Sequence, residues 1–164
     1  MHVLRFGRLT AAHRGWWCGR PLVLRLYNET ILSVLGGATK LIFSNSGWQP
    51  RDGVNFARVL PLCANLEILV LVSNFIGDEG CTAIAEAVGQ GALPKLKALR
   101  ITNNEIKDAG CRALAAAMRA GALPALTAMG FHHDYAGMRN LAGDEARAEL
   151  REACKARGVE SIHC

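Results

Sequence analysis

The sequence has few aromatic residues and lacks any apolar run long enough to cross a membrane. Aromatic side chains make up 6% of the 164 residues. A membrane-spanning helix needs about 20 consecutive apolar residues, and no uncharged apolar stretch of that length occurs. We therefore expect no membrane span. Hydrophobic residues make up 51% of the chain, which is enough for the core of one ordinary domain.

Closely spaced cysteine pairs are also missing. No two cysteines stand in a CxxC arrangement, which excludes a zinc ribbon. Single thiols scattered along a chain with a sufficient core are typical of a reducing compartment, so we expect a cytoplasmic location. The triplet Asn28-Glu29-Thr30 is a glycosylation sequon, but such triplets often arise by chance. The six cysteines are Cys18, Cys63, Cys81, Cys111, Cys154 and Cys164.

Acidic residues are absent from the first 28 positions, which contain five arginines. The net charge of +5 therefore comes from this segment, and the remaining 14 basic residues balance the 14 acidic ones. A neutral body releases few counterions from a phosphate backbone, so we expect no nucleic-acid partner.

Residues 1–37 form an irregular basic segment by this interpretation, and residues 38–164 form the folded domain. Three alternatives remain open for the basic segment. Leu22, Leu24 and Leu26 could form a degenerate capping strand. The Arg-rich, acid-free composition is also typical of an organellar transit peptide, which would change the expected location. The third alternative is the irregular start of a truncated chain.

A repeat of thirty residues is the strongest feature of the sequence. Leu66–Asn74 follows the pattern LxxLxLxxN, and Leu96–Asn104 follows it again. The match continues, because Gly91–Pro94 reappears intact as Gly121–Pro124. Agreement in register over a whole unit is the signature of a repeat architecture. A third copy has its apolar strand positions at Leu126, Met129 and Phe131.

Each part of the repeat predicts a local structure. Leu69 and Leu71 alternate with Val70, as in a strand with one buried face. Asn74 follows the strand, where a buried amide can satisfy the backbone of neighbouring turns. Asp78, like Asp108, is expected to be the N-cap of its helix. The buried helix stripes are Cys81, Ile84, Ala85 and Val88, then Cys111, Leu114, Ala115 and Met118.

Weaker copies flank the two clear repeats. The first copy has its strand around Leu41 and Phe43, with Trp48, Phe56, Ala57 and Leu60 at core positions. After the third strand, six extra residues fall between Phe131 and Asn140. The last helix is expected at about 144–157, and residues 159–162 are expected to form a final strand.

This pattern resembles the ribonuclease-inhibitor-like leucine-rich-repeat family. The residues that carry the resemblance are Leu66–Asn74 with Gly77–Gly80, and Leu96–Asn104 with Asp108–Gly110. The resemblance implies an α/β solenoid of about four repeats, with parallel strands on the concave face and helices on the convex face. It also implies that the concave face binds another protein. Two alternatives are a GTPase regulator of the Ran-activator type and a fragment of a larger leucine-rich-repeat receptor or scaffold.

Strand residues between the apolar positions should face the concave surface. Ile42, Val70 and Val72 would form an apolar stripe there, and such patches mark interaction sites. The insertion should project as a loop at the strand end, with Tyr135 and Arg139 as rim contacts because such residues are enriched in binding hot spots. The predicted partner-binding residues are Ile42, Val70, Val72, Arg100, Thr102, His132, Tyr135 and Arg139.

No catalytic, cofactor or metal site is predicted. His132-His133-Asp134 is the most chemically suggestive cluster, but adjacent residues of an extended chain point to opposite sides. Cys81 and Cys111 hold equivalent helix positions about 8–10 Å apart, which is beyond the reach of a disulfide. Gly77–Gly80 lacks the lysine of a phosphate-binding loop and the ligand spacing of a calcium loop. These residues are interpreted as scaffold or solvated loop, and the chain is not expected to be an enzyme.

Overall fold

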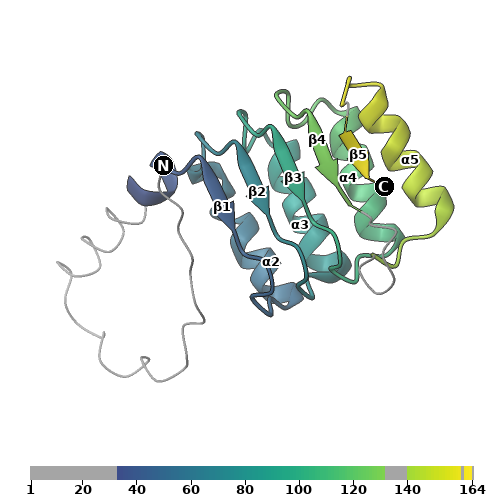
Figure 1. The fold of residues 1–164 in the computed structure, drawn as a ribbon, viewed down its shortest axis with the longest axis horizontal. Coiled ribbons are helices and arrows are strands. Elements are labelled where there is room, and N and C mark those ends of the chain that lie inside the picture. Colours follow the sequence, from purple (N-terminus) through teal and green to yellow (C-terminus); the bar gives the residue numbers. More distant parts are fainter. Residues whose placement is uncertain (1–32, 132–139, 160, 164) are drawn as a thin grey trace.

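The computed structural model describes residues 33–131, 140–159 and 161–163. Five parallel strands lie side by side in chain order, and four α-helices cover one face of the sheet (Figure 1). This arrangement confirms the predicted solenoid of stacked strand–helix units. The strands are β1 Lys40–Ile42, β2 Ile68–Val70, β3 Ala98–Arg100, β4 Ala128–Gly130 and β5 Ser161–His163. The helices are α2 Pro50–Ala57, α3 Gly77–Gly89, α4 Asp108–Arg119 and α5 Asp144–Lys155, with a 3-10 turn η2 at Leu60–Leu62.

The core follows the repeat. Leu41, Leu69, Leu99 and Met129 are paired across β1 to β4, and all four are buried. Because strand side chains alternate between faces, these four point toward the helices and their neighbours point away. Every residue of the predicted stripes on α3 and α4 is buried as well.

Small residues bring neighbouring helices together. A Cβ placed on Gly110 of α4 would lie 3.0 Å from Cβ of Cys81 on α3. The Cys81 thiol donates to the Gly110 carbonyl at 3.5 Å, and the Cys111 thiol donates to the Ala146 carbonyl at 3.3 Å. Both cysteines are free and buried, which confirms that they are small core residues rather than a disulfide.

Buried asparagines connect the turns that follow the strands. Asn74 Nδ2 donates to the carbonyls of Phe43 at 2.7 Å and Leu71 at 2.9 Å. Its Oδ1 accepts from the backbone N–H of Ser46 and Trp48 in the preceding repeat. Asn140 bridges the third and fourth repeats in the same way. The predicted role of these amides is confirmed.

The predicted role of Asp78 and Asp108 as N-caps of their own helices was wrong. Asp78 lies in the first turn of α3, and its Oδ1 accepts from the N–H of Lys107 at 2.9 Å and of Gly110 at 2.8 Å. Asp108 Oδ1 likewise accepts from the N–H of Gly143 at 2.7 Å. Each aspartate therefore caps the helix of the next repeat, because stacking sets the helix N-termini side by side.

The flanking repeats differ in detail from the expectation. Leu60 is buried but lies in η2 rather than in α2, because Pro61 cannot continue the helical hydrogen bonding. Trp48 is only half-buried and packs on Phe43 and Phe56, with ring centroids 4.6 and 5.1 Å away. Residues 33–37, within the segment interpreted as irregular, are helical. The final strand begins at Ser161, two residues later than predicted.

The close contact at Gly110 gives a test of the packing. Alanine at Gly110 would bring its Cβ within 2.9 Å of Asp78 Oδ1 and 2.8 Å of the Ile106 side chain, so Gly110→Ala should lower the free energy of unfolding by about 1–3 kcal/mol. Gly89, at the end of α3, has no atom within 4 Å of the same position. Gly89→Ala should therefore be neutral or stabilise by up to about 1 kcal/mol. Urea unfolding of both variants checks this, and equal stability of the two would contradict the packing.

Candidate functional site

The face of the sheet opposite the helices is formed by two in-register rows. The rows are Lys40, Ile68, Ala98 and Ala128, and then Ile42, Val70, Arg100 and Gly130. Arg100 is exposed and the others are half-buried, whereas the residues that alternate with them are buried. The structure therefore places Ile42, Val70 and Arg100 together on this face, as the repeat predicted.

An apolar patch occupies the β1–β2 side of this face. Ile42 is paired with Val70, and Ile68 and Val72 lie before and after Val70 on the same side of the chain. All four side chains are half-buried. We call these residues, Ile42, Ile68, Val70 and Val72, the apolar patch. Its side chains keep part of their surface available for contact with another molecule.

Arg100 borders the apolar patch on β3. Its side chain makes no hydrogen bond or ion pair with any residue that the structure describes. A Cβ placed on Gly130 would lie 3.6 Å from Arg100 Cγ, so the stem of the arginine extends along the bare backbone of β4. Because Ala98, Ala128 and Gly130 are small, they form a low floor around the guanidinium.

The remaining predicted contacts are placed differently. Thr102 is 6% exposed, so the expectation that it offers surface to a partner does not hold. Its short side chain lies where the strand passes into the turn of Asn103 and Asn104. His132, Tyr135 and Arg139 lie outside the described residues.

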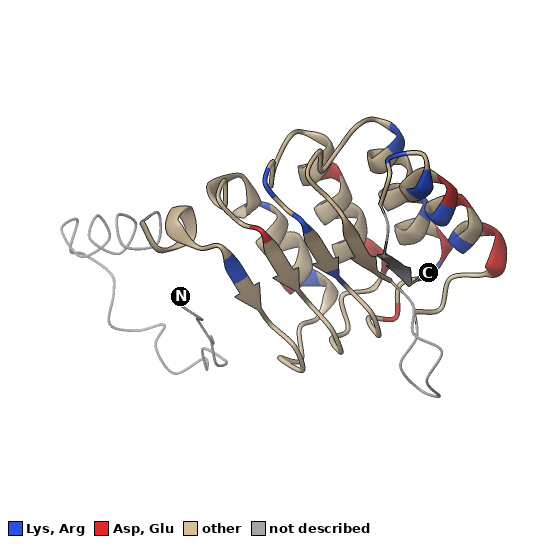
Figure 2. Ribbon diagram, turned by 45° about the horizontal axis from the view of Figure 1, so that its top comes forward, with Lys and Arg blue, Asp and Glu red and all other residues tan. Residues whose placement is uncertain are grey.

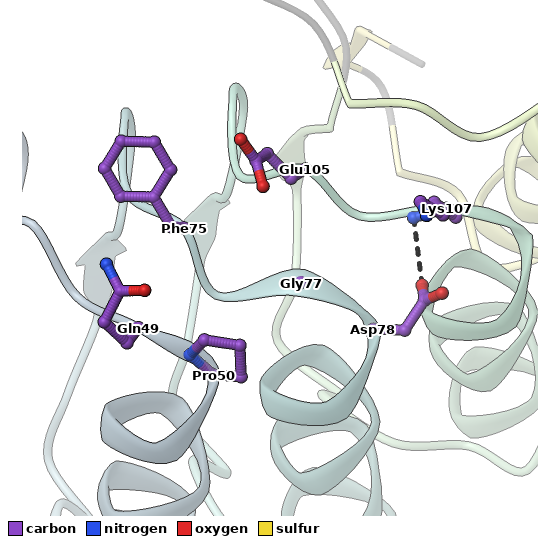
Figure 3. Close-up of a pocket in the computed structure, with 7 residues that line it drawn as sticks. All are labelled: Gln49, Pro50, Phe75, Gly77, Asp78, Glu105 and Lys107. Carbon is purple, nitrogen blue, oxygen red and sulfur yellow. Dashed lines mark hydrogen bonds between the residues drawn. The ribbon is translucent and has the colours of Figure 1, made fainter.

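A hollow at the loop edge was not predicted from the sequence. It lies where the strands pass into the helices and has a volume of about 400 Å³ (Figure 3). Phe75 stands at its edge with 49% of its surface exposed, and the carboxylate of Glu105 lies across from it (Figure 3). The lining residues are Gln49, Pro50, Phe75, Gly77, Asp78, Glu105 and Lys107.

The loop that carries Phe75 departs from the repeat. Gly47 and Glu105 adopt positive φ at the position of Phe75, whereas the second repeat has positive φ at Gly77 instead. Asn74 N–H then donates to the Asn103 carbonyl, and the buried Asn104 Oδ1 has no donor among the described residues. An unsatisfied buried acceptor costs about 1–3 kcal/mol.

Sequence reasoning missed Phe75, although one signal was present. The position that follows the buried asparagine is held by Phe75, Glu105 and Leu141 in three repeats, and in the first repeat, where Ser46 replaces the asparagine, by Gly47. Phe75 and Leu141 are both exposed, at 49% and 57%. A large apolar side chain at a position that is otherwise glycine or glutamate indicates surface function rather than packing.

The convex side carries paired charges. Arg112 of α4 lies 3.1 Å from Glu149, 3.6 Å from Glu145 and 3.8 Å from Asp108. These contacts lower the pKa of Glu149 through its hydrogen bond to Arg112. Figure 2 shows the charged residues of both signs gathered on α4 and α5, while the strands are mostly uncharged. Exposed ion pairs of this kind add little stability, but they neutralise one another.

The described residues were compared with the requirements of a metal site, a reactive thiol and a membrane span. No three His, Cys, Asp or Glu side chains among them form a group that could hold a metal ion. Burial raises the pKa of the Cys63 and Cys154 thiols to about 11, so neither is an activated nucleophile. No helix in the described part of the chain is long and apolar enough to span a membrane.

Known proteins support the same fold. A leucine-rich-repeat family model matches residues 62–85 and 92–115, which are the two clear repeats. The solved structure of actin-binding site 2 of leiomodin-1 aligns with a TM-score of 0.62 and 20% identity, over 83% of this chain and 75% of that chain. A search of curated proteins gives no match. The chain is therefore a leucine-rich-repeat solenoid, and at this identity the structural likeness concerns the fold alone.

The buried thiols give a chemical test of the core. Burial raises the pKa of Cys111 to about 12, with a further contribution from Asp108, and it raises the pKa of Cys81 as well. Cys63, Cys81, Cys111 and Cys154 should resist iodoacetamide at pH 8 in the folded protein and react in urea, as measured by peptide mass spectrometry. Rapid alkylation of native Cys81 would contradict the packing.

The same shifts predict a pH dependence of stability. The thiols have higher pKa values in the folded chain than their value of about 8.5 in an unfolded one. Their contribution is therefore fully present below pH of about 8.5 and is lost as pH rises toward the folded values. Urea unfolding at pH 7 and pH 10 should show lower stability at pH 10.

Proposed function

We propose that this chain is a protein-binding module that contacts its partner through the apolar patch and Arg100. The observation that carries the proposal is that a half-buried apolar cluster lies on the sheet beside an arginine whose side chain has no partner among the described residues. Apolar surface with an arginine at its border is the composition of binding hot spots. No described group of residues supports a catalytic role.

The partner footprint is proposed to extend to Phe75. The chain runs from Val70 and Val72 on the patch directly through Asn74 to Phe75 at the hollow. A partner lying along β2 would meet both surfaces. Tyr135 and Arg139 are proposed as additional rim contacts on sequence grounds, together with His132.

The proposal also covers the subfamily of the repeat, the kind of partner and the location of the protein. The helices that cover one face of the sheet and the spacing of 28 to 33 residues between paired strands support the ribonuclease-inhibitor-like subfamily. The leiomodin-1 segment is named for actin binding, which supports protein binding as a use of this fold and does not identify the partner here. Four buried free thiols support a reducing, cytoplasmic location.

Charge substitutions on the two faces test the role of the concave surface. Val70→Glu with Arg100→Glu should reduce partner recovery from native-cell extract at least tenfold, because it places two carboxylates on the patch. The matched control is Ala116→Glu with Arg58→Glu, which makes the same charge change at exposed sites away from the sheet. Quantitative mass spectrometry of tagged protein measures recovery. Equal loss in both variants, or none in either, would contradict the proposal.

Phe75 has its own test. Phe75→Ser should leave the melting temperature nearly unchanged, because half of the ring is already exposed, while partner recovery falls several-fold. Leu62→Ser is the matched control, since Leu62 is another exposed apolar residue, at 37%, and lies in η2. A similar effect of both substitutions on recovery would remove Phe75 from the footprint.

A further inference from the structure

We infer that the concave face recognises a single linear segment of its partner, in which apolar side chains stand next to carboxylates. This inference rests on the proposed protein-binding function and adds the chemistry of the recognised segment. It is carried by the charges of the face, by their positions relative to the apolar patch and by the size of the face.

The charges of this face are of one sign. Lys40 and Arg100 are its two charged residues among the paired positions of β1 to β4, and no acidic residue occurs there. Neither one makes an ion pair with the described residues. By contrast, Lys97, just before β3, pairs with Glu67 at 3.0 Å. The unpaired cations are therefore available to an incoming carboxylate, which an arginine can bind with two parallel hydrogen bonds.

The two cations stand on opposite sides of the apolar patch. Lys40 is on β1 in the first row and Arg100 is on β3 in the second row, and Ile68 and Val70 lie on the strand between them. Neighbouring strands are about 4.8 Å apart, so the two positions are separated by about 10 Å across the sheet. A segment that satisfies both has apolar side chains in its middle and carboxylates about three or four residues apart, at about 3.3 Å per extended residue.

The low floor beside Arg100 keeps its guanidinium accessible. Gly130 has no side chain, and Ala98 and Ala128 have only methyl groups. The described neighbours of Arg100 on the β4 side therefore leave room for a carboxylate beside it. On the other side, the larger Val70 and Ile42 supply the apolar contact.

The size of the face favours a linear segment over a folded domain. Five strands at about 4.8 Å spacing span about 20 Å, and three residues per strand span about 10 Å. The strands alone therefore have a footprint of about 200 Å², which is smaller than the roughly 800 Å² of accessible surface per partner in a standard interface between folded proteins. One extended segment of about six residues crosses it.

A nucleic acid fits this face less well. Phosphate binding draws its free energy from several cations that release counterions, and here two cations flank an apolar centre. That centre would be left in contact with a charged backbone. A protein segment satisfies both the cations and the patch.

Selection from a displayed library of random 12-residue peptides tests the inference with the full chain as bait. On the wild type, Asp or Glu should be enriched next to apolar residues. On Arg100→Glu, the acidic preference should fall and Lys or Arg should be enriched instead. Synthetic peptides from the wild-type selection should bind Arg100→Glu and Arg100→Gln at least tenfold more weakly by fluorescence anisotropy. Arg58→Glu should bind them like the wild type.

The outcomes separate the two levels of the proposal. Peptides that bind Val70→Glu as well as the wild type would place binding elsewhere and overturn the proposed function together with this inference. If the selected peptides do not bind Val70→Glu but show no enrichment of Asp or Glu, only the inference about the recognised segment would be overturned. Failure to select any peptide would overturn the inference that the face recognises a linear segment. A labelled single-stranded oligonucleotide that binds the wild type and not Arg100→Glu would assign the face to nucleic acid and also overturn it. Circular dichroism melts confirm that each variant is folded.

Discussion

The fold depends on satisfying the backbone of the turns that follow each strand. Asn74, Asn104 and Asn140 are buried at these turns, and an unpaired polar group buried beside them would cost about 1–3 kcal/mol. Asn74 and Asn140 solve this by donating to carbonyls of two repeats and accepting from N–H groups of the preceding one. Each amide therefore fixes the distance between neighbours. The strands align because their turns are tied together.

On the helix side, neighbouring repeats are also connected by hydrogen bonds, here between aspartate side chains and the backbone of the next helix. Asp78 and Asp108 cap the helices that follow theirs, and Gly110 allows α4 to approach Cys81 of α3. No repeat completes its own hydrogen bonding or its own packing. A single unit is therefore unstable alone, which is why stability in such solenoids resides in the interfaces between units.

Features that recur at a fixed spacing could be predicted from the sequence. Features that depend on which of two adjacent repeats a side chain contacts could not. Leu69, Leu99 and Asn74 recur at fixed spacing, and that spacing determines which face is buried. The spacing of Asp78 is equally regular, but it does not say whether the carboxylate caps its own helix or the next one. The shift of positive φ from the position of Phe75 to Gly77 is a property of one loop and leaves no periodic signal, although the position of Phe75 is also exposed at Glu105 and Leu141. Thr102 follows the strand alternation, but its side chain is buried. Alternation predicts the face toward which a side chain points, and it does not predict the exposed fraction of that side chain.

The two faces of the sheet differ in how their charged side chains are paired. On the convex side Arg112, Glu149 and Arg119 satisfy one another, so a partner that used them would first have to separate existing pairs. On the opposite face of the sheet Arg100 is exposed, and its side chain has no ion pair among the described residues, while Ile42 and Val70 are half-buried. Arg100 differs from the charged residues of the convex side, because its side chain makes no ion pair with the described residues and lies beside the half-buried apolar side chain of Val70.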